Sequence, residues 1–295
     1  MVAPAPARRS RRRRIATKVV ICLAVIATYA GSLLGYYLLS GSARPLPPPD
    51  LGTTADTVVL VNLIALHTVD NRLDVEVAVV PKDDLMDTRL DVVNTNMAVR
   101  LYPPNQQGDL VYPQGKPTSA VFKTTIDANG HPDRWPFESY NTHEISADVL
   151  IGDGDDRTYL PARVEVTGSL EGWDISSTRS GDATQSAPDG DNVTLTLTRA
   201  QGPLFIDLGI CLVLISLPVL ALYVAIQMVR GKKKFVAPFS TWYAAMLFAI
   251  VPLRNILPGA PPPGAWIDQA LVLWVLIALV VAMAMYIYAW HRNSD

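Results

Sequence analysis

Residues 193–213, VTLTLTRAQGPLFIDLGICLV, decide the fold. Apolar side chains at Val193, Leu195 and Leu197 alternate with threonines, which is the period-two pattern of a strand with one buried face. Only AQGP, residues 200–203, separates this strand from a long apolar run, which predicts a membrane-spanning helix. The chain therefore passes from a β-rich domain into a membrane within a few residues.

Four apolar stretches are long enough to cross a bilayer, for which a helix needs about 20 residues. We expect transmembrane helices at residues 15–39, 203–229, 235–253 and 265–290. Basic residues flank them in the tail at 1–14, the loop RGKKK at 230–234 and the tail at 291–295. Because Lys and Arg beside spans stay in the cytoplasm, this pattern predicts a multi-pass plasma-membrane protein with both termini inside. A cleaved signal peptide is the alternative for the first stretch, whose apolar core exceeds the usual ~7–15 residues.

The third and fourth stretches are separated by RNILPGAPPPG, residues 254–264. Proline lacks the amide hydrogen that a helix uses, and its ring clashes with the preceding turn. We therefore expect an external turn here, and a single kinked helix is the alternative.

The large segment between the first two spans is acidic and β-rich. Residues 40–53 form a proline-rich spacer, and 54–202 form the expected extracytoplasmic domain. Period-two runs such as LDVEVAVV at 73–80 alternate with turn sequences, which predicts an antiparallel β-sandwich. Residues 40–202 carry 12 Lys and Arg against 24 Asp and Glu, so nucleic acid is not an expected partner. The two cysteines, Cys22 and Cys211, fall in predicted spans, so we expect no disulfide in the domain.

Three ionisable residues lie near the external ends of the predicted spans: Asp207, Arg254 and Asp268. Charges in a membrane are costly and tend to pair, so we expect Arg254 to bind Asp207 or Asp268. We favour a structural fastener, and the alternative is an external entrance for protons or ions.

Two further sets of residues predict packing. Ala27, Gly31 and Gly35 form a row of small residues that would pack on another helix, within the chain in preference to a partner. In the loop WPFESY at 135–140, we expect the aromatic rings to plug the open end of the sandwich, with a ligand site as the alternative. These loop anchors are Trp135, Phe137 and Tyr140.

Signals for metals and catalysis are weak. The side chains His131, Asp133, His143 and Glu144 could approach one another, but their spacing matches no defined metal site, which favours a polar loop. GDGDD at 152–156 fails the calcium-loop formula at Arg157 and favours a hairpin turn. We find no nucleophile motif, phosphate-binding loop or zinc-helix motif, and we expect neither an enzyme nor a cofactor.

Two stretches resemble signatures of one family. WPFESY at 135–140 and LRNILPGAPPPGAWID at 253–268 are similar to sequences of a membrane-protein family known as domain of unknown function 4436, common in actinobacteria. The resemblance implies a bacterial plasma membrane and an envelope context, and it carries over no catalytic residues. The Pro-Phe-acid element is also similar to one in pentameric ligand-gated channels, but a span before the domain and the lack of a polar pore-lining helix depart from that pattern.

We therefore expect a mixed membrane protein with an extracytoplasmic antiparallel β-sandwich and four transmembrane α-helices, one before and three after the sandwich. Its expected function is that of an accessory or scaffolding component of the cell envelope, which presents an acidic domain to a protein or lipid-bearing partner. The alternative is a subunit of an oligomeric transporter or channel, formed by association of identical chains. A metal-dependent enzyme using His131 and His143 ranks last.

Overall fold

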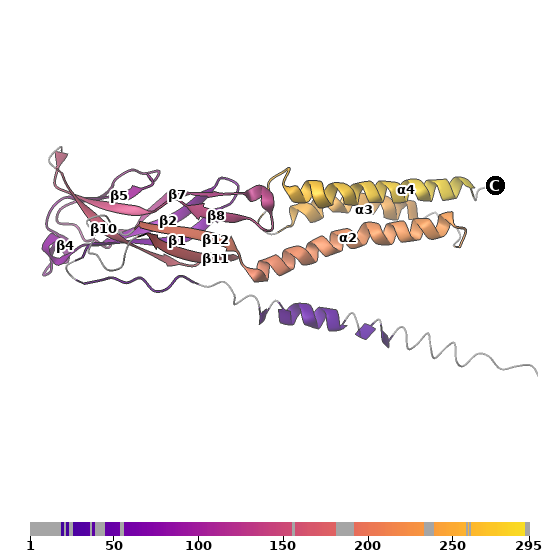
Figure 1. Cartoon of the computed structure of the whole chain (residues 1–295), viewed down its shortest axis with the longest axis horizontal. Coiled ribbons are helices and arrows are strands. Elements are labelled where there is room, and N and C mark those ends of the chain that lie inside the picture. Colours follow the sequence, from indigo (N-terminus) through magenta and orange to yellow (C-terminus); the bar gives the residue numbers. More distant parts are fainter. Residues whose placement is uncertain are drawn as a thin grey trace, which may run out of the picture.

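A sheet domain occupies one end of the molecule and apolar helices occupy the other (Figure 1). The computed structural model describes residues 19–20, 22–23, 26–35, 37–38, 45–53, 56–154, 157–180, 192–232, 239–257, 259 and 261–292. The predicted basic tail at 1–14, the start of the spacer, Lys233 and Lys234 of the basic loop, and residues 293–295 lie outside this part.

The domain contains twelve strands within the described residues, together with the short 3-10 turns η1 (Asp83–Leu85) and η2 (Pro132–Arg134). The strands are β1 Val58–His67, β2 Arg72–Val80, β3 Met86–Asp87, β4 Val92–Val93, β5 Met97–Tyr102, β6 Leu110–Tyr112, β7 Phe122–Gly130, β8 Ser139–Thr142, β9 Ser146–Ile151, β10 Thr158–Gly168, β11 Trp173–Ser180 and β12 Asn192–Arg199.

The apolar residues that recur with period two in the sequence are the buried residues of the strands. In β2, the side chains of Leu73, Val75 and Val77 are fully buried, and in β12 those of Leu195 and Leu197 are buried likewise. They join one apolar core with the inward residues of the other strands. Burial of this alternating set is what stabilises the domain, whose described residues contain no cysteine that could form a disulfide.

Ten strands form one sheet in the order β11-β12-β8-β7-β2-β1-β10-β9-β5-β6, and β3 pairs with β4 separately. The expected antiparallel sandwich is corrected to a single curled, mostly antiparallel sheet with one parallel pair, β1 and β10. The long strand β10 causes this, because it pairs with β9 through residues 158–162 and with β1 through 163–168. The curl brings edge strand β11 back to β10, where Arg179 donates a hydrogen bond to the Val164 carbonyl oxygen at 3.4 Å.

The proline-rich spacer is part of the domain from residue 45 onward. Leu46 is buried in the core, and its amide donates to the carbonyl oxygen of Gly168 at 3.1 Å. Asp50 pairs with Arg163 at 3.2 Å. This part of the segment therefore lies against the sheet.

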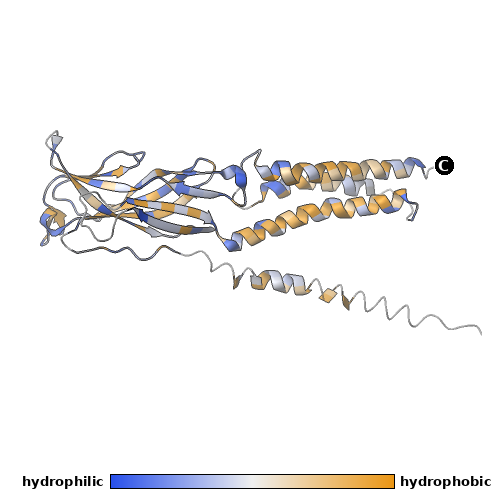
Figure 2. Cartoon of the chain, in the orientation of Figure 1, coloured by the Kyte–Doolittle hydropathy of each residue, from blue (hydrophilic) through white to orange (hydrophobic). Residues whose placement is uncertain are grey.

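Three helices follow the sheet: α2 (Gln201–Val229), α3 (Phe239–Asn255) and α4 (Leu273–Arg292), the last continuous with the π-helical turn η4 (Asp268–Val272). In the described part of the chain, Gln201–Val229 and Asp268–Arg292 are long and apolar enough to cross a membrane (Figure 2). α3 has 17 residues, or about 25 Å, against a hydrocarbon core of about 30 Å. The described residues thus contain two candidate spans, while parts of two other predicted spans, 15–39 and 235–253, lie outside them.

The three helices pack around their own apolar core. Small residues of α2, Ala221 and Ala225, face Ala282 of α4 in a buried cluster, which allows these two helices to approach closely. Tyr243 of α3 donates a hydrogen bond to the carbonyl oxygen of Ala221 at 3.0 Å, and its ring lies 5.3 Å from that of Tyr286. Outside this core the helices present apolar side chains on their surfaces.

The predicted small-residue face lies on the helical segment 26–35. A Cβ atom at Gly35 would meet the Phe205 ring of α2 at 3.7 Å, whereas one at Gly31 would meet nothing within 4 Å. Ala27 is exposed. The structure therefore brings only the Gly35 end of this face to the other helices.

An ion pair at the β5–β6 edge of the sheet makes the stability of the domain depend on pH. Arg100 of β5 binds Asp109, beside β6, through two hydrogen bonds of 2.7 and 2.8 Å. These bonds lower the pKa of Asp109 below its usual value of 3.8. A carboxyl whose pKa is lower in the folded state stabilises the fold above its unfolded pKa, and this contribution is lost as the pH falls through the folded pKa.

We expect Asp109→Asn to lower the free energy of unfolding by about 1 kcal/mol at pH 7, the upper range for surface ion pairs, because this pair is partly buried. The difference from wild type should shrink towards zero below pH 4. Urea unfolding of the purified chain across pH, followed by circular dichroism, measures both. Asp127→Asn, at an exposed carboxyl of β7, is the control. A difference that persisted unchanged at pH 2 would contradict the assignment.

Candidate functional site at the domain junction

The sheet passes into the helices with almost no linker. β12 ends at Arg199 and α2 begins at Gln201. The residue between them, Ala200, is buried and donates its amide hydrogen to the Gly172 carbonyl oxygen at 2.9 Å, while its own carbonyl accepts from Leu204. The first turn of α2 is therefore fixed directly to the end of the sheet.

Three buried charged side chains meet at this point, and we call them the junction triad: Glu138, Arg199 and Asp207. The Arg199 guanidinium donates to Glu138 Oε1 from Nη2 at 2.7 Å and from Nε at 3.0 Å. Its Nε lies 3.6 Å from Asp207 Oδ2. The side chains are 6%, 2% and 0% exposed for Arg199, Glu138 and Asp207. One guanidinium thus joins a loop of the sheet domain, the last strand β12 and helix α2.

Aromatic rings hold the guanidinium in place. The Arg199 guanidinium lies over the Trp173 ring, 5.4 Å from its centroid, and Tyr140 packs edge-on against the same Trp173 ring, with 5.3 Å between the ring centroids. Tyr140 is fully buried, and burial together with the charge of Glu138 raises its pKa. Gly130, paired with Tyr140 across the strands, leaves room for that ring.

The triad has one more carboxyl than it has cations. Glu138 Oε2 and both carboxyl oxygens of Asp207 accept no hydrogen bond from the described residues. Removing a charge from water is costly unless it is paired, so the guanidinium is essential to this arrangement. Chemically, the triad can hold the sheet domain and α2 together. Its two carboxyl groups face one guanidinium, so one added proton would make the group neutral.

The loop WPFESY connects the sheet with the helix ends. Trp135 is buried among Cys211, Leu257, Ala265 and Ile267, which belong to α2, the turn after α3, and the start of the last helix. It therefore packs into the helices, and only Tyr140 takes the expected place at the end of the sheet core. Phe137 is 59% exposed and plugs nothing within the described chain.

Arg254 and Asp268 form a second, separate ion pair. Two hydrogen bonds of 2.9 and 2.8 Å join the guanidinium to the carboxylate. Arg254 also donates to the carbonyl oxygen of Pro262, and Asp268 accepts from the amide of Gly264. This pair closes the proline-rich turn between α3 and α4. Of the three residues predicted as one cluster, the structure brings two together and gives Asp207 to Arg199.

The turn also contacts the triad. Gly259 has a φ of +79°, and a Cβ atom there would fall on the Arg199 guanidinium. Glycine is thus required at this position for two reasons, the left-handed backbone conformation and the closeness of the guanidinium. The same guanidinium therefore touches the sheet domain, α2 and the α3–α4 turn.

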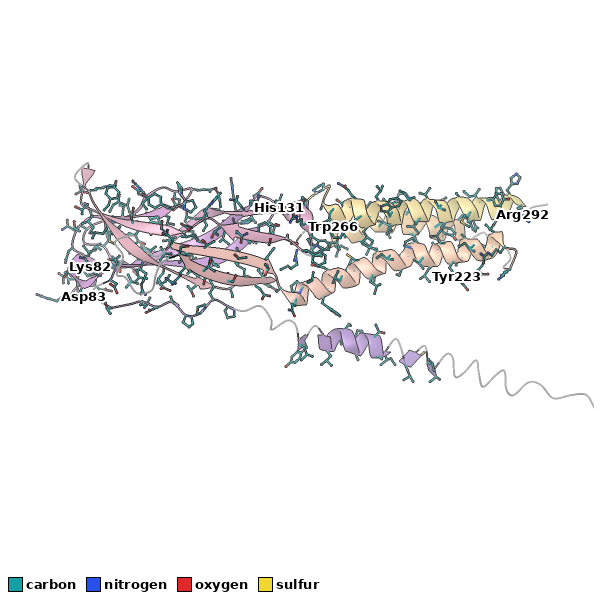
Figure 3. The ribbon with its side chains drawn as sticks, viewed as in Figure 1. Lys82, Asp83, His131, Tyr223, Trp266 and Arg292 are labelled. Carbon is teal, nitrogen blue, oxygen red and sulfur yellow. The ribbon has the colours of Figure 1, made fainter. Side chains whose placement is uncertain are left out.

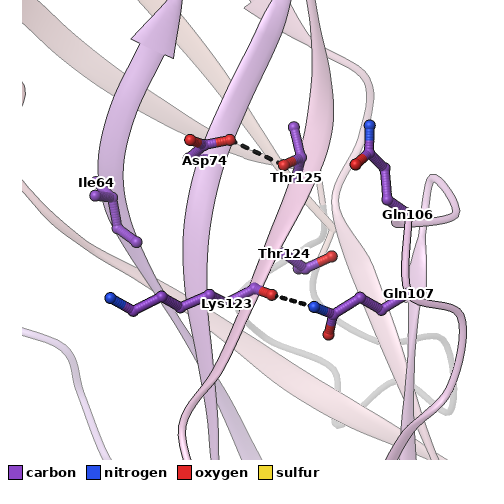
Figure 4. Close-up of a pocket in the computed structure, with 7 residues that line it drawn as sticks. All are labelled: Ile64, Asp74, Gln106, Gln107, Lys123, Thr124 and Thr125. Carbon is purple, nitrogen blue, oxygen red and sulfur yellow. Dashed lines mark hydrogen bonds between the residues drawn. The ribbon is translucent and has the colours of Figure 1, made fainter.

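A groove on the sheet surface offers less to a ligand. It has a volume of about 340 Å³ and is lined by Ile64, Asp74, Gln106, Gln107, Lys123, Thr124 and Thr125 (Figure 4). Several of its polar groups already bond within the protein: Thr125 donates to Asp74 at 2.9 Å, and Gln107 donates to the Lys123 carbonyl oxygen at 2.6 Å. A hydrogen bond from His67 lowers the pKa of Asp74. The junction is the better candidate site.

The residues considered for metal binding separate into different contacts. His131 and His143 line one open groove, where Asn129 bonds to His143 at 2.8 Å, and Asp133 lies 3.9 Å from His131. Glu144 instead accepts from Ser180 and Asn192. No three His, Cys, Asp or Glu residues in the described part are placed to hold a metal ion.

The acidic turn GDGDD also has a structural contact. Asp153 accepts two bonds from the Asn96 amide, at 2.8 and 3.0 Å, and residues 155–156 lie outside the described part. Its one described carboxylate thus joins two loops of the sheet domain.

The sequence reasoning missed Arg199 and Glu138. A signal for Arg199 was present, because an aspartate inside an apolar helix needs a cation, and Arg199 is the nearest one before Asp207 in the chain. Glu138 gave no such signal, since its place depends on how the sheet folds.

Comparison with known families divides the chain at this junction. Residues 47–197 match a family model described as Domain of unknown function (DUF4436), and residues 199–293 match one described as Domain of unknown function (DUF8686). No curated protein matches the chain. The triad crosses the boundary between the two matched regions, with Glu138 in the first and Arg199 and Asp207 in the second.

We expect Arg199→Leu to destabilise the protein by about 3–5 kcal/mol, because it leaves two buried carboxyl groups without a counter-charge. Adding Glu138→Gln and Asp207→Asn should recover much of this loss. Arg100→Leu, at a pair that is partly exposed to solvent, is the control and should cost about 1 kcal/mol or less. Thermal unfolding in mild detergent, followed by tryptophan fluorescence, measures the effects. An Arg199→Leu protein with unchanged stability would show that the triad holds nothing together.

Gly259→Ala should destabilise the junction more than Gly264→Ala. Both glycines have positive φ, but only a Cβ at Gly259 meets the Arg199 guanidinium, whereas one at Gly264 meets nothing within 4 Å. The shared backbone strain, about 1 kcal/mol, therefore cancels in the comparison. The melting temperatures of the two variants under identical conditions measure this difference. Equal temperatures would contradict the contact between Gly259 and the Arg199 guanidinium.

Proposed function

The chain belongs to the DUF4436 family, and we propose that it is a non-enzymatic integral membrane protein of the bacterial plasma membrane, an accessory or scaffolding component that holds an acidic sheet domain outside the membrane. The proposal includes four spans, with both termini in the cytoplasm and the Arg254 turn on the external side. One observation carries it: the junction triad fixes the sheet domain to the helices, so the domain is presented in one orientation.

The charge and surface of the molecule support this proposal. The region from 40 to 202 has a formal charge of −12, while the helices expose apolar side chains such as Leu212 and Val280. Exposed apolar faces on long helices are suited to lipid. An acidic domain on a rigid base is suited to a partner with a positively charged surface, an envelope protein in the first instance.

A subunit of an oligomeric transporter or channel is the alternative. The observation that favours it is the surplus carboxyl of the triad, buried where α2 begins. After association of identical chains, Asp207, Arg254 and Asp268 would stand around an external entrance.

The test is to extract the tagged full-length chain from its own membranes in mild detergent and to determine the mass and composition of the complex. We expect a stoichiometric, unrelated partner. Insertion of six Gly and Ser residues after Ala200 should reduce recovery of that partner at least tenfold, because the domain then loses its fixed orientation. The same insertion between Gln114 and Gly115, in an exposed turn of the sheet domain, is the control.

Two results would count against the scaffold. Equal partner recovery from both insertion variants would show that orientation does not matter. A ring of identical chains, with ion flux in vesicles that Asp207→Asn abolishes, would establish the channel or transporter instead.

A further inference from the structure

Four large apolar side chains are exposed around the junction, and we call them the junction collar: Phe137, Phe205, Ile256 and Trp266. Their exposed fractions are 59%, 46%, 69% and 41%. They come from the loop of the sheet domain, the first turns of α2, the turn directly after α3 and the start of the last helix. Trp266 is seen at the meeting of sheet and helices in Figure 3.

The triad sets the height of Phe137 along the helices. Its neighbour Glu138 shares the Arg199 guanidinium with Asp207, at 2.7 Å and 3.6 Å. The loop must therefore lie beside the second turn of α2. In that turn, Phe205, Ile206 and Leu208 are all at least 39% exposed, so Phe137 lies at the same height as apolar residues that face outward from the helix.

The length of α2 places this height at a membrane boundary. With 29 residues, the helix is about 44 Å long, and a hydrocarbon core is about 30 Å thick. Some of its turns must therefore lie in the interfacial layer. Arg230, at one end, and Asp207, near the other, are the charged residues that bracket the apolar part. The collar lies at the Asp207 end.

We propose that the junction collar lies in the interfacial layer of the bilayer and that Phe137 inserts the sheet domain itself into lipid. This inference rests on the proposed function, because it requires the helices to span the membrane. The occupant of the collar is lipid, since the collar continues the exposed apolar surface of α2 without a break in height. Aromatic side chains are favoured in this layer.

The loop is built so that Phe137 points outward. Its neighbours on either side, Pro136 and Glu138, are buried, as is Trp135, so the backbone cannot turn the ring inward without unpacking the junction. Arg134 is exposed in the same loop. At a bilayer surface the anionic headgroups lie outside the acyl chains. A cation beside an inserted aromatic ring is therefore placed to meet the headgroups while the ring meets the acyl chains.

The test measures the depth of single positions in the full-length chain reconstituted in lipid nanodiscs. In a background of Cys22→Ser and Cys211→Ala, a nitroxide label is placed by Phe137→Cys. Electron paramagnetic resonance then compares collisions with oxygen, which concentrates in lipid, and with a water-soluble nickel chelate. Leu90→Cys, 70% exposed between β3 and β4, and Leu212→Cys, 68% exposed on α2, provide the aqueous and lipid controls.

We expect the oxygen-to-nickel collision ratio at position 137 to exceed that at position 90 at least threefold, and to remain below that at position 212. A ratio at 137 equal to that at 90 would overturn the inference, while a lipid-like ratio at 212 would leave the proposed function standing. If 212 also resembles 90, the helices do not span and the proposed function fails.

A third outcome is informative. An immobilised label at 137 that neither reagent reaches would mean that a protein surface covers the collar, which also overturns the inference. Should Phe137→Cys fail to fold, Ile256→Cys tests the collar from the helix side with the same expected ratio.

Discussion

The structure depends on one guanidinium that must serve two buried carboxyl groups. Arg199 stands at the end of the last strand, and neither Glu138 nor Asp207 has another cation within reach in the described part of the chain. Because an unpaired buried charge is far more costly than an exposed one, the loop, the strand and the helix can be buried together only in this arrangement. The position of the sheet domain on the helices follows from it.

Around this point the packing is cooperative. Trp135 enters the space between helix ends, and the turn that Arg254 and Asp268 close brings Gly259 against the guanidinium. The two ion pairs therefore have different tasks. The ion pairs of Arg199 fix the sheet domain to α2, and the Arg254–Asp268 pair closes the turn that packs against the Arg199 guanidinium. In a region with little water, such hydrogen-bonded pairs are geometrically demanding, which favours a single arrangement.

The sequence predicted those features that depend on local pattern. The period-two runs of β2 and β12 were visible because burial follows spacing in a strand. The apolar helices α2 and α4 were visible from the length of their uninterrupted apolar runs. The prolines around 254–264 indicated a turn. The parallel pairing of β1 with β10 was not predictable in this way, since it joins residues about 100 positions apart and leaves no periodic trace. The same holds for Glu138. For Arg254 the sequence left two partners open, Asp207 or Asp268, and the structure pairs it with Asp268, while Asp207 lies beside Arg199.

The direct passage of β12 into α2 also has a mechanical consequence. β12 lies between β11 and β8, and its hydrogen bonds run perpendicular to the strand. A pull along α2 would act along β12 and load these bonds in shear, all at the same time, instead of opening them one after another. Tension arriving from the helices would thus be borne jointly by the ladders that β12 forms with β11 and β8, before either neighbour could peel away.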